Sequence, residues 1–447
     1  MTRHRIVLPL AALAVVAGAA IAGAAVTAAP GWAVRTIPVL GAVQGGVVRR
    51  GPDILVGQGG FGAGLQQIVR VREDGSATTV ATGFNSLGGF DLAADGTLYV
   101  VDNGGNLAGA TTGDTVFAIP QALTRTTAVT AAGHEVVPAG SITAGQDVVL
   151  APDTSLYVTD AVGIGLGRVV RIVGGVVTPF AAGLDYTAGA ALGAGGTLLV
   201  GNVDAGFAGA LLAYPLAGGG PTSIATGLSG IYAMVRETDG TMLVSGGFTG
   251  DFSSSTIVAV DPAPPYARTE RAHGFGFSSE MFHDADRDET LVLDYGATAI
   301  VALCRERDGD GLCDADDPCT FPVAVGGAKI ALAKLGAPAG DEKLALKGEL
   351  VVPTSPALDP IANGAHLRIE SGAGVVADVV VPGGAFDVDA GTGWKLKKTT
   401  WSWKGNVGGV TRVSVKADPD APGHVTVKAS GKGGGWAVDG VICRCGR

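Results

Sequence analysis

A short motif of β-forming residues recurs six times along this 447-residue chain. It stands at Ile54-Leu55-Val56, Leu98-Tyr99-Val100, Leu156-Tyr157-Val158, Leu198-Leu199-Val200, Met242-Leu243-Val244 and Leu291-Val292-Leu293, and successive central residues are 44, 58, 42, 44 and 49 positions apart. A second motif, Ala-x-Gly, alternates with the first at Ala81-Thr82-Gly83, Ala131-Ala132-Gly133, Ala181-Ala182-Gly183, Ala225-Thr226-Gly227 and Ala272-His273-Gly274. Two alternating signals with a period of about 40–50 residues are typical of a β-propeller, in which each repeat forms one blade.

The second repeat indicates how the strands of one blade follow each other. From the centre outward, they are expected at Gly89–Ala93, Thr97–Asp102, Val116–Ile119 and Ala128–Ala131. Asp-Gly and Gly-Gly pairs between such runs favour tight hairpins. The long second interval predicts an insertion, across Gly104–Gly113 or around His134–Ser141. Six triplets but only five Ala-x-Gly motifs leave the last blade one strand short, and Thr36–Leu40 is expected to supply that strand and close a six-bladed ring.

The first 28 residues have the layout of a secretory signal peptide. Arg3 and Arg5 precede an uncharged, alanine-rich stretch that ends in small residues, and cleavage is expected after Ala28. An uncleaved membrane anchor is the alternative, because the stretch is just long enough to span a bilayer. No cysteine directly follows the stretch, and no other apolar run is long enough to cross a membrane. We therefore expect a secreted protein, extracellular or periplasmic, with no membrane span after cleavage.

Charge is distributed unevenly over the rest of the chain. Before Thr320 there are 16 Lys+Arg, all of them arginine, against 30 Asp+Glu, which gives −14; from Thr320 onward there are 15 against 11, which gives +4. The two values sum to the chain's −10. The shift predicts a propeller over residues 34–303, a linker over 304–320 and a second domain over 321–447. An acidic propeller is a poor candidate for binding nucleic acid. The lysines of the mildly basic second domain are expected to form a solvated face; the alternatives are weak pairing with the acidic propeller or with an anionic surface.

The second domain is expected to be a β-sandwich, so that the whole chain is all-β. Its β-forming runs are Lys329–Leu335, Lys343–Val352, His366–Glu370, Val375–Val381, Trp394–Trp403, Thr411–Lys416 and His424–Lys428. Polar and apolar residues alternate along the last two runs, as in strands with one buried face. This number of short strands suits a β-sandwich.

An acidic segment at the domain boundary has the spacing of a calcium-binding loop. Such loops place oxygen ligands at positions 1, 3, 5, 7, 9 and 12, with a glycine at position 6. Those positions are occupied by Glu306, Asp308, Asp310, the Leu312 carbonyl, Asp314 and Asp317, with Gly311 as the glycine. Carboxylates that converge on one point repel each other unless a hard cation neutralises them. The segment therefore predicts a Ca²⁺ site, with an acidic solvated linker as the alternative.

With Cys313 and the following Pro318-Cys319, this segment resembles a thrombospondin type 3 repeat. The resemblance covers residues 306–319 and implies a structural calcium site between domains. It differs from the family in having glutamate at the first position and in being a single copy. All five cysteines lie at or after Cys304, and export permits disulfides. Cys313 and Cys319 are close enough in the sequence to pair. Cys443 and Cys445 are too close to bridge each other easily, so one or both are expected to pair elsewhere, and Cys304 is a candidate partner for them.

The run DLAADGTLYVVD, residues 91–102, resembles the inner hairpin of six-bladed propellers of the NHL-repeat and senescence-marker-protein/gluconolactonase group. The resemblance covers roughly residues 40–303. The lactonase branch of that group holds a divalent metal on the propeller axis, through Asn, Asp and Glu that stand eight residues before the turn glycine. The matching positions here are Gly88, Gln146, Ala188, Tyr232 and Glu280. Glu280 is therefore the one anionic ligand that the resemblance implies.

Other carboxylates are expected near one rim of the ring. Asp102, Asp160, Asp204 and Asp294 follow second strands, and Asp91 and Asp147 lie on inner strands. They are candidates for a cation or polyol site at the mouth of the channel, but strand-end aspartates commonly cap turns by accepting backbone N–H bonds. The chain has no nucleophile elbow, P-loop, zinc-protease motif or dinucleotide-binding glycine pattern.

These features predict a non-enzymatic, secreted protein that binds a protein, peptide or glycan and carries structural calcium. The alternative is a metal-dependent, lactonase-like hydrolase at the channel mouth, with Glu280, Asp102 and Asp294 as candidate ligands. A purely architectural surface protein is the third option.

Overall fold

The computed structural model describes residues 26–246, 255–306, 313–314, 325–334, 340–352, 354, 358–371 and 374–436. The chain divides into two compact units, 1–320 and 321–447. Only residues 26–28 of the expected signal peptide lie among the described residues. No described helix is long and apolar enough to cross a membrane.

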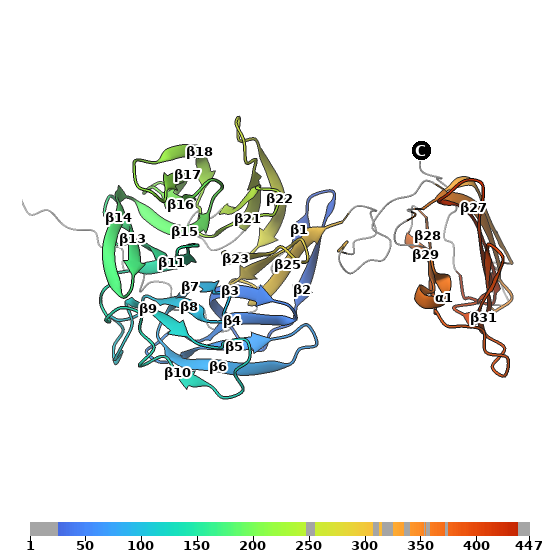
Figure 1. Ribbon diagram of the computed structural model, residues 1–447, viewed down its shortest axis with the longest axis horizontal. Coiled ribbons are helices and arrows are strands. Elements are labelled where there is room, and N and C mark those ends of the chain that lie inside the picture. Colours follow the sequence, from blue (N-terminus) through green and yellow to red (C-terminus); the bar gives the residue numbers. More distant parts are fainter. Residues whose placement is uncertain are drawn as a thin grey trace, which may run out of the picture. The chain divides into compact units, whose positions relative to one another are not determined.

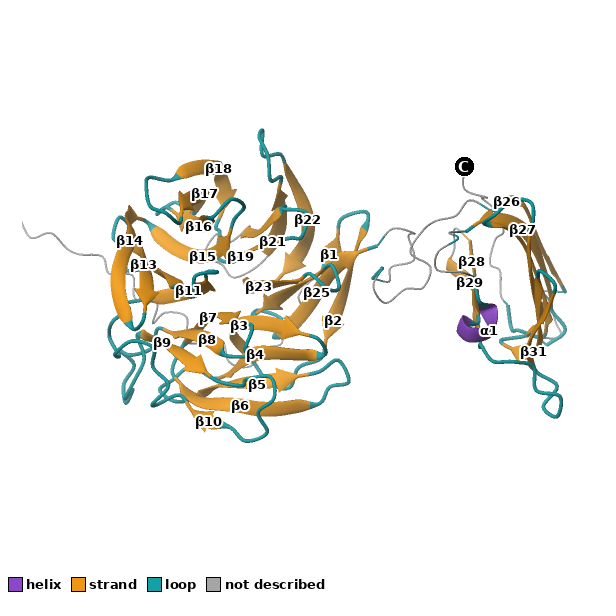
Figure 2. Cartoon of the chain, viewed as in Figure 1, coloured by secondary structure: helices purple, strands orange, loops and turns teal. Residues whose placement is uncertain are grey.

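The first unit is built from separate, mainly antiparallel sheets whose strands follow each other along the chain (Figures 1 and 2). The first strand of each sheet is innermost: β3 (Val43–Arg50), β7 (Leu87–Leu92), β11 (Gly145–Leu150), β15 (Tyr186–Leu192), β19 (Met234–Arg236) and β23 (Ser278–Asp284). The second strands are β4 (Asp53–Gly59), β8 (Leu98–Asp102), β12 (Leu156–Asp160), β16 (Thr197–Val203), β20 (Met242–Gly246) and β24 (Glu289–Asp294). Each of the six triplets lies in one of these second strands.

The outer strands complete the sheets. The third strands are β5 (Gln66–Val71), β9 (Thr115–Ile119), β13 (Gly167–Val173), β17 (Ala208–Pro215), β21 (Ser255–Val260) and β25 (Ala299–Arg305). Four sheets have a fourth strand from the same repeat: β6 (Ala77–Phe84), β14 (Val176–Leu184), β18 (Thr222–Ser229) and β22 (Arg268–Phe275). Two short strands, β1 (Thr27–Ala28) and β10 (Val129–Thr130), add to β22 and β6.

The inner strands form a closed ring in the first unit. β3 contacts β7, the contacts continue through β11, β15 and β19 to β23, and β23 contacts β3. Each pair of neighbouring sheets encloses an apolar cluster, such as that of Leu55, Phe84 and Phe117 between the first two sheets. Sheets arranged in this way around a common centre are the blades of a β-propeller.

The second sheet differs from the expectation at its outer edge. The predicted fourth strand, Ala128–Ala131, contains β10, but β10 pairs in parallel with β6 of the preceding sheet. The outer side of β9 is instead covered by the segment around Glu135, which forms a single bridge with Phe117. The backbone N–H of Ala118 also donates to the His134 carbonyl at 2.9 Å. The inserted residues around His134 therefore take the place of the fourth strand.

An N-terminal strand completes the last sheet. β2 (Trp32–Ile37) pairs antiparallel with β25, from Trp32 opposite Arg305 to Ile37 opposite Ile300. The expected segment, Thr36–Leu40, overlaps β2 at two residues only, so the strand begins earlier than predicted. The guanidinium groups of Arg271 and Arg305 lie 3.7 and 4.4 Å from the centre of the Trp32 ring. Cation–π attraction therefore helps to hold this strand.

A buried ion-pair network joins the last sheet to the first. Arg49 of β3 is 3 % exposed and lies 2.8 Å from Glu289, 2.6 Å from Glu73 and 3.3 Å from Asp284. Arg35 of β2 contacts the other oxygen of Glu289 at 2.8 Å. Because Glu289 and Asp284 belong to the last sheet, Arg49 connects the two ends of the ring.

The second unit contains a six-stranded sheet and a hairpin that share one core. The sheet consists, in spatial order, of β26 (Gly326–Ala333), β27 (Lys343–Val351), β33 (His424–Lys432), β32 (Val410–Ala417), β31 (Thr400–Val407) and β30 (Gly393–Lys397). The hairpin is β28 (Ala365–Ser371) and β29 (Gly374–Val381), preceded by the short helix α1 (Pro360–Asn363). Trp394, Trp403 and Val413 of the sheet pack with Ile369 and Val379 of the hairpin. The single predicted run over residues 394–403 is two strands, because a turn at residues 398–399 divides it.

We expect Arg49→Met to destabilise the first unit by about 3–5 kcal/mol, because it leaves the buried Asp284 without its cation and leaves Glu289 with Arg35 alone. Thermal unfolding of the full chain should show this as a Tm lowered by roughly 10 °C. Arg287→Met is the matched control, since Arg287 contacts Glu73 at 3.1 Å but is 32 % exposed, and it should change stability by less than about 1 kcal/mol. Equal shifts in the two variants would mean that Arg49 does not close the ring.

Candidate functional site at the centre of the propeller

Three carboxylates lie on the inner strands at the centre of the first unit. Asp91 is on β7, Asp147 on β11 and Glu280 on β23. In β11 and β23 the register with the second strand shifts just before the carboxylate, at 145/147 and 278/280. Such bulges redirect side chains, and here each is followed at once by a buried acid.

Asp147 and Glu280 reach the same point beside the backbone of β7. A Cβ at position 89 would lie 2.8 Å from Glu280 Oε2 and still closer to Asp147 Oδ1. Gly89 therefore leaves the room that both carboxylates occupy. The two side chains come from different sheets and form a carboxyl pair at the centre of the ring.

The three carboxylates differ in their hydrogen bonds. Asp91 Oδ2 accepts the Leu150 N–H of β11 at 2.7 Å, and Asp147 Oδ2 accepts the Ala190 N–H of β15 at 2.8 Å, so each ties its strand to the next sheet. Glu280 Oε1 accepts the N–H of the following residue, Met281, at 2.9 Å. Among the described residues, no donor reaches Glu280 Oε2. Glu280 therefore keeps an oxygen available to a ligand.

The carboxyl pair retains a proton near neutral pH. Burial raises the pKa of Asp147 to about 7, against the lowering effect of N–H bonds from Ala190 and Val148. Burial and the charge of Asp147 raise the pKa of Glu280 well above its usual range. Two carboxyl groups this close cannot both ionise cheaply. The protonated member can donate a hydrogen bond to a ligand, and the ionised member can accept one.

The candidate ligands Asp102 and Asp294 have a different geometry. Both are fully buried at the ends of β8 and β24. Asp102 accepts N–H bonds from Asn85, Ser86 and Gly104 at 2.8, 3.0 and 2.9 Å. Asp294 accepts N–H bonds from Gly276 and Phe277 at 3.0 Å each. Both oxygens of each carboxylate are thus bonded to the segment that enters the inner strand, which favours the turn-capping role.

Four partly exposed aromatic rings lie in a row at the rim where the inner strands begin, which we call the starting rim. They are Tyr186, Tyr232, Phe277 and Tyr295, and successive ring centres are 5.7, 5.2 and 6.4 Å apart. We name this row the aromatic arc. The Tyr186 hydroxyl donates to the Gln146 side chain at 3.1 Å. Burial raises the pKa of Tyr186 to about 12, so its hydroxyl stays protonated.

Sequence reasoning marked part of this site and missed the rest. It singled out Glu280, Gln146, Tyr232, Asp91 and Asp147 individually. The Asp147–Glu280 pair and the aromatic arc were missed because they depend on which sheets meet. A usable signal exists for three of the rings. Each of these rings follows the glycine of an Ala-x-Gly motif: Tyr186 by three residues, Tyr232 by five and Phe277 by three. They therefore stand where the chain enters the next inner strand.

The predicted calcium loop lies mostly outside the described residues. Of its six ligand positions, Glu306 and Asp314 are described, whereas Asp308, Asp310, Leu312 and Asp317 are not. No group of three or more potential metal-binding side chains occurs in the part of the chain that the structure describes. The Asp314 N–H donates to the Arg305 carbonyl at 2.8 Å. Because Arg305 directly precedes Glu306, this bond brings the backbone of Asp314, the ninth position of the expected loop, close to that of Glu306, the first position.

A disulfide joins Cys304 to Cys313 and corrects the expected pairing of Cys313 with Cys319. Cys304 is the second-last residue of β25 and pairs with Ala33 of β2, and both cysteines are buried. The bond therefore closes the start of the acidic segment against the last sheet. Cys319, Cys443 and Cys445 lie outside the described residues.

No protein-family model matches this chain, and no curated protein matches it either. Among solved structures, it is similar to regucalcin, a calcium-binding protein from Agrobacterium tumefaciens, with 12 % identity over 61 % of this chain and 96 % of that chain and a TM-score of 0.42. It is also similar to the PQQ-bound aldose sugar dehydrogenase of Streptomyces coelicolor, with 14 % identity over 62 % and 99 % and a TM-score of 0.43. An auxiliary nutrient binding protein from Bacteroides ovatus shares 11 % identity over 62 % and 77 %, with a TM-score of 0.42.

The carboxyl pair should make stability depend on pH. A carboxyl whose folded-state pKa is raised to about 7 stabilises the fold at low pH, and this contribution is lost as the pH rises through about 7. Glu280→Gln should therefore reduce the loss of stability between about pH 5 and about pH 8 by on the order of 1 kcal/mol. The measurement is denaturant unfolding at both pH values. Glu270→Gln, at an exposed residue of β22, is the control; if both variants match the unmodified protein, the pair does not share a proton.

Proposed function

We propose that this chain is a secreted binding protein in which the six sheets form a six-bladed propeller that binds a glycan at its starting rim. The aromatic arc is the observation that carries this proposal. Aromatic side chains supply large apolar contact faces, and tyrosine adds a polar group. Successive rings are inclined to each other by 51°, 72° and 87°, so a ring whose face is turned to the rim can stack on the apolar face of one sugar.

Polar groups beside the arc supply the hydrogen bonds that a sugar needs. The Gln146 amide is already in contact with the Tyr186 hydroxyl. Glu280 stands three residues after Phe277 on the inner strand that begins there, and the pair that it forms with Asp147 can both donate and accept while it retains one proton. Sugar hydroxyls also donate and accept, so a neutral glycan is the ligand class that these groups favour over a peptide or protein.

A hydrolase is the second candidate, and Glu280 is the observation that favours it. Its Oε2 receives no hydrogen bond among the described residues, and its pKa is raised. A raised pKa suits a general acid. A metal-dependent hydrolase would need further metal ligands besides Glu280. The two that the sequence suggested, Asp102 and Asp294, already accept hydrogen bonds from backbone N–H groups. Product release from a bound oligosaccharide, lost in Glu280→Gln, would favour this candidate over simple binding.

We further propose that the chain is exported and holds Ca²⁺ in the segment from Glu306 to Asp317. The leader-like N-terminus and the Cys304–Cys313 disulfide support export. The disulfide and the Asp314–Arg305 hydrogen bond support the metal site, because they bring its first and ninth positions together. The acidic side chains would bind the ion, and the ion would hold together carboxylates that otherwise repel.

Removing a ring from the arc should weaken glycan binding. Tyr232→Ala is expected to lower the affinity roughly five- to tenfold for the neutral hexasaccharide that the unmodified protein binds most tightly, because one aromatic contact is lost. The measurement is calorimetric titration after a screen of neutral hexasaccharides. Phe180→Ala removes a half-buried ring from the outer strand β14 and should leave the affinity unchanged. If no hexasaccharide binds the unmodified protein, or both variants bind equally, glycan binding at the arc is wrong.

Calcium content tests the metal site separately. The mature protein should hold about one calcium ion per chain after dialysis against metal-free buffer, because the segment supplies a full set of oxygen ligands. Asp310→Ala should lose that ion, whereas Asp389→Ala, at an exposed acid of the second unit, should keep it. Calcium is measured by atomic emission. Retention of the metal by the Asp310 variant would place the ion elsewhere, and absence of metal from the unmodified protein would refute the site.

A further inference from the structure

One face of the six-stranded sheet in the second unit carries cations on every strand. The pairing register places Lys329, Lys347, Lys428, Ser414, Ser402 and Lys395 in a single row across all six strands. The neighbouring rows on the same face contain Arg412 and Lys404 on one side, and Lys416 and Lys397 on the other. We call these three rows the basic face.

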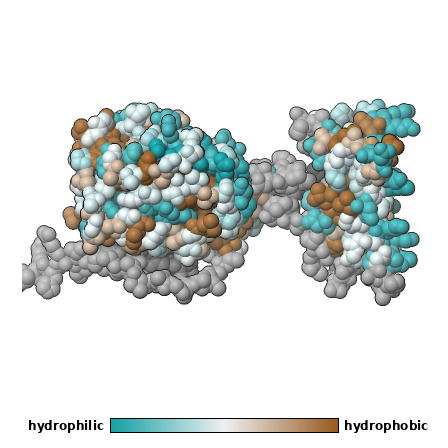
Figure 3. All heavy atoms as spheres, turned by 90° about the horizontal axis from the view of Figure 1, so that it is seen from below, coloured by the Kyte–Doolittle hydropathy of each residue, from teal (hydrophilic) through white to brown (hydrophobic). Residues whose placement is uncertain are grey.

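The opposite face of the same sheet explains why the cations point outward. Residues that alternate with them, such as Leu344, Val413 and Trp403, are buried in the core of the second unit. Side chains alternate between the two faces of a strand. On the five strands other than β26, all the cations of the basic face are accordingly exposed: Lys347, Lys395, Lys397, Lys404, Arg412, Lys416 and Lys428. Figure 3 shows hydrophilic residues projecting from one side of this unit.

The cations of the basic face have few anionic neighbours. Within the described residues, none of them has a carboxylate within 4.0 Å, and Glu349 is the one acid whose strand position shares the face. Lys395 instead lies 3.6 Å from the centre of the Phe386 ring. The charge is therefore available to a partner.

Cross-strand pairing on this face sets like charges directly against each other. Lys347 stands opposite both Lys329 and Lys428, and Lys404 stands opposite Arg412. Like charges in directly opposite positions destabilise a sheet. Lysines protect edge strands from aggregation, but Lys428 and Arg412 lie on central strands, where edge protection is not needed. An anionic partner would remove the repulsion.

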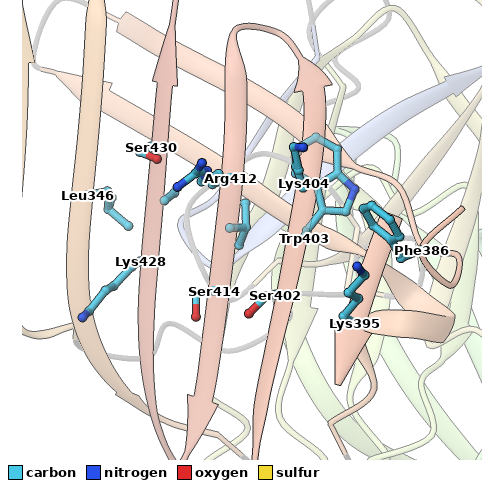
Figure 4. Close-up of a pocket in the computed structure, with 12 residues that line it drawn as sticks. Leu346, Phe386, Lys395, Ser402, Trp403, Lys404, Arg412, Ser414, Lys428 and Ser430 are labelled. Carbon is cyan, nitrogen blue, oxygen red and sulfur yellow. The ribbon is translucent and has the colours of Figure 1, made fainter. Parts of the chain in front are cut away.

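The basic face is also hollowed and rich in hydroxyl groups. A hollow of about 700 Å³ is lined by three serines, four cations and five apolar or aromatic residues: Ser402, Ser414, Ser430, Lys395, Lys404, Arg412, Lys428, Leu346, Phe386, Trp403, Val413 and Ala429. In Figure 4, Ser414 and Ser402 lie between Lys428 and Lys395, with Phe386 beside Lys395. Neighbouring strands are about 4.8 Å apart, which is close to the length of one sugar ring. The row therefore presents cations and hydroxyls at the repeat of a polysaccharide chain.

We propose that the basic face binds an anionic polysaccharide, a sugar polymer that carries carboxylate or sulfate groups. The lysines and Arg412 pair with the acidic groups, and the serines bond to sugar hydroxyls. Single-stranded nucleic acid is less suited, because such sites stack successive bases on several exposed rings. Here Phe386 lies beside Lys395, and Trp403, which also lines the hollow, is 2 % exposed. The rows also lack the large apolar side chains of surfaces that insert into membranes, so a membrane would be held by charge attraction to anionic lipids alone. This site is independent of glycan binding by the propeller.

The test compares two matched variants of the full chain. Lys347→Gln combined with Lys428→Gln removes two charges from the basic face, and Lys334→Gln combined with Lys398→Gln removes two charges from turns outside it. The probes are polygalacturonate for carboxylate, dextran sulfate for sulfate and dextran as the neutral polymer. Single-stranded DNA and phosphatidylglycerol vesicles represent the other classes. Affinity is measured at about 50 mM and about 200 mM salt.

We expect one of the two acidic polysaccharides to bind and dextran not to bind. The Lys347/Lys428 variant should bind roughly five- to tenfold more weakly, and the Lys334/Lys398 variant within about twofold of the unmodified protein. The Lys347/Lys428 variant should also keep or raise the Tm, because it removes like-charge contacts, so weaker binding cannot be ascribed to misfolding. The proposal is overturned if neither acidic polysaccharide binds, if both variants lose affinity equally, or if binding is confined to DNA or vesicles.

Discussion

The burial of Arg49 between the first and last sheets is the interaction on which the first unit depends. A ring of sheets has no free edge only if its two ends meet, and the ends here come from opposite parts of the unit's sequence. Arg49 meets two carboxylates of the last sheet, Asp284 and Glu289, in a setting where an unpaired charge is strongly unfavourable. β2 adds to the same sheet and brings Arg35 to Glu289. Ring closure is thus specified by charge as well as by apolar packing.

The candidate site is a consequence of that closure. Asp147 and Glu280 belong to sheets far apart in the sequence, and they approach each other only where β23 returns beside β3 and β7. The close approach needs Gly89, because a side chain there would occupy the space of both carboxylates. Strands at the centre of a propeller therefore create an acidic, proton-retaining site that no single sheet contains. The aromatic arc arises in the same way, from rings on successive segments that enter the inner strands.

Sequence patterns predicted those parts of the structure that depend on local periodicity. The six triplets lie in the second strands, and alternation along residues 411–416 and 424–428 gives strands with one buried face. Features that depend on tertiary contacts were not predictable. Val129 and Thr130 have β propensity, but their partner is β6 rather than β9. Cys313 pairs with Cys304 because β25 ends beside it, a fact that spacing within the acidic segment does not contain. For the same reason, the sequence identified Glu280 but not its pairing with Asp147.

The two units use positive charge in different ways, and the choice of residue follows the use. The 16 cations before Thr320 are all arginine, and Arg49 shows why, since its planar guanidinium contacts three carboxylates at once. The eleven lysines all lie in the second unit. Lysine is a flexible, well-hydrated point charge that suits solvent-exposed contacts with changing partners better than fixed buried pairs. Arginine therefore holds the propeller together, whereas the lysines of the six-stranded sheet remain directed to solvent. Lys347 stands between two other lysines, an arrangement that lowers the stability of the sheet. Binding of an external anion therefore explains this arrangement better than the stability of the fold does.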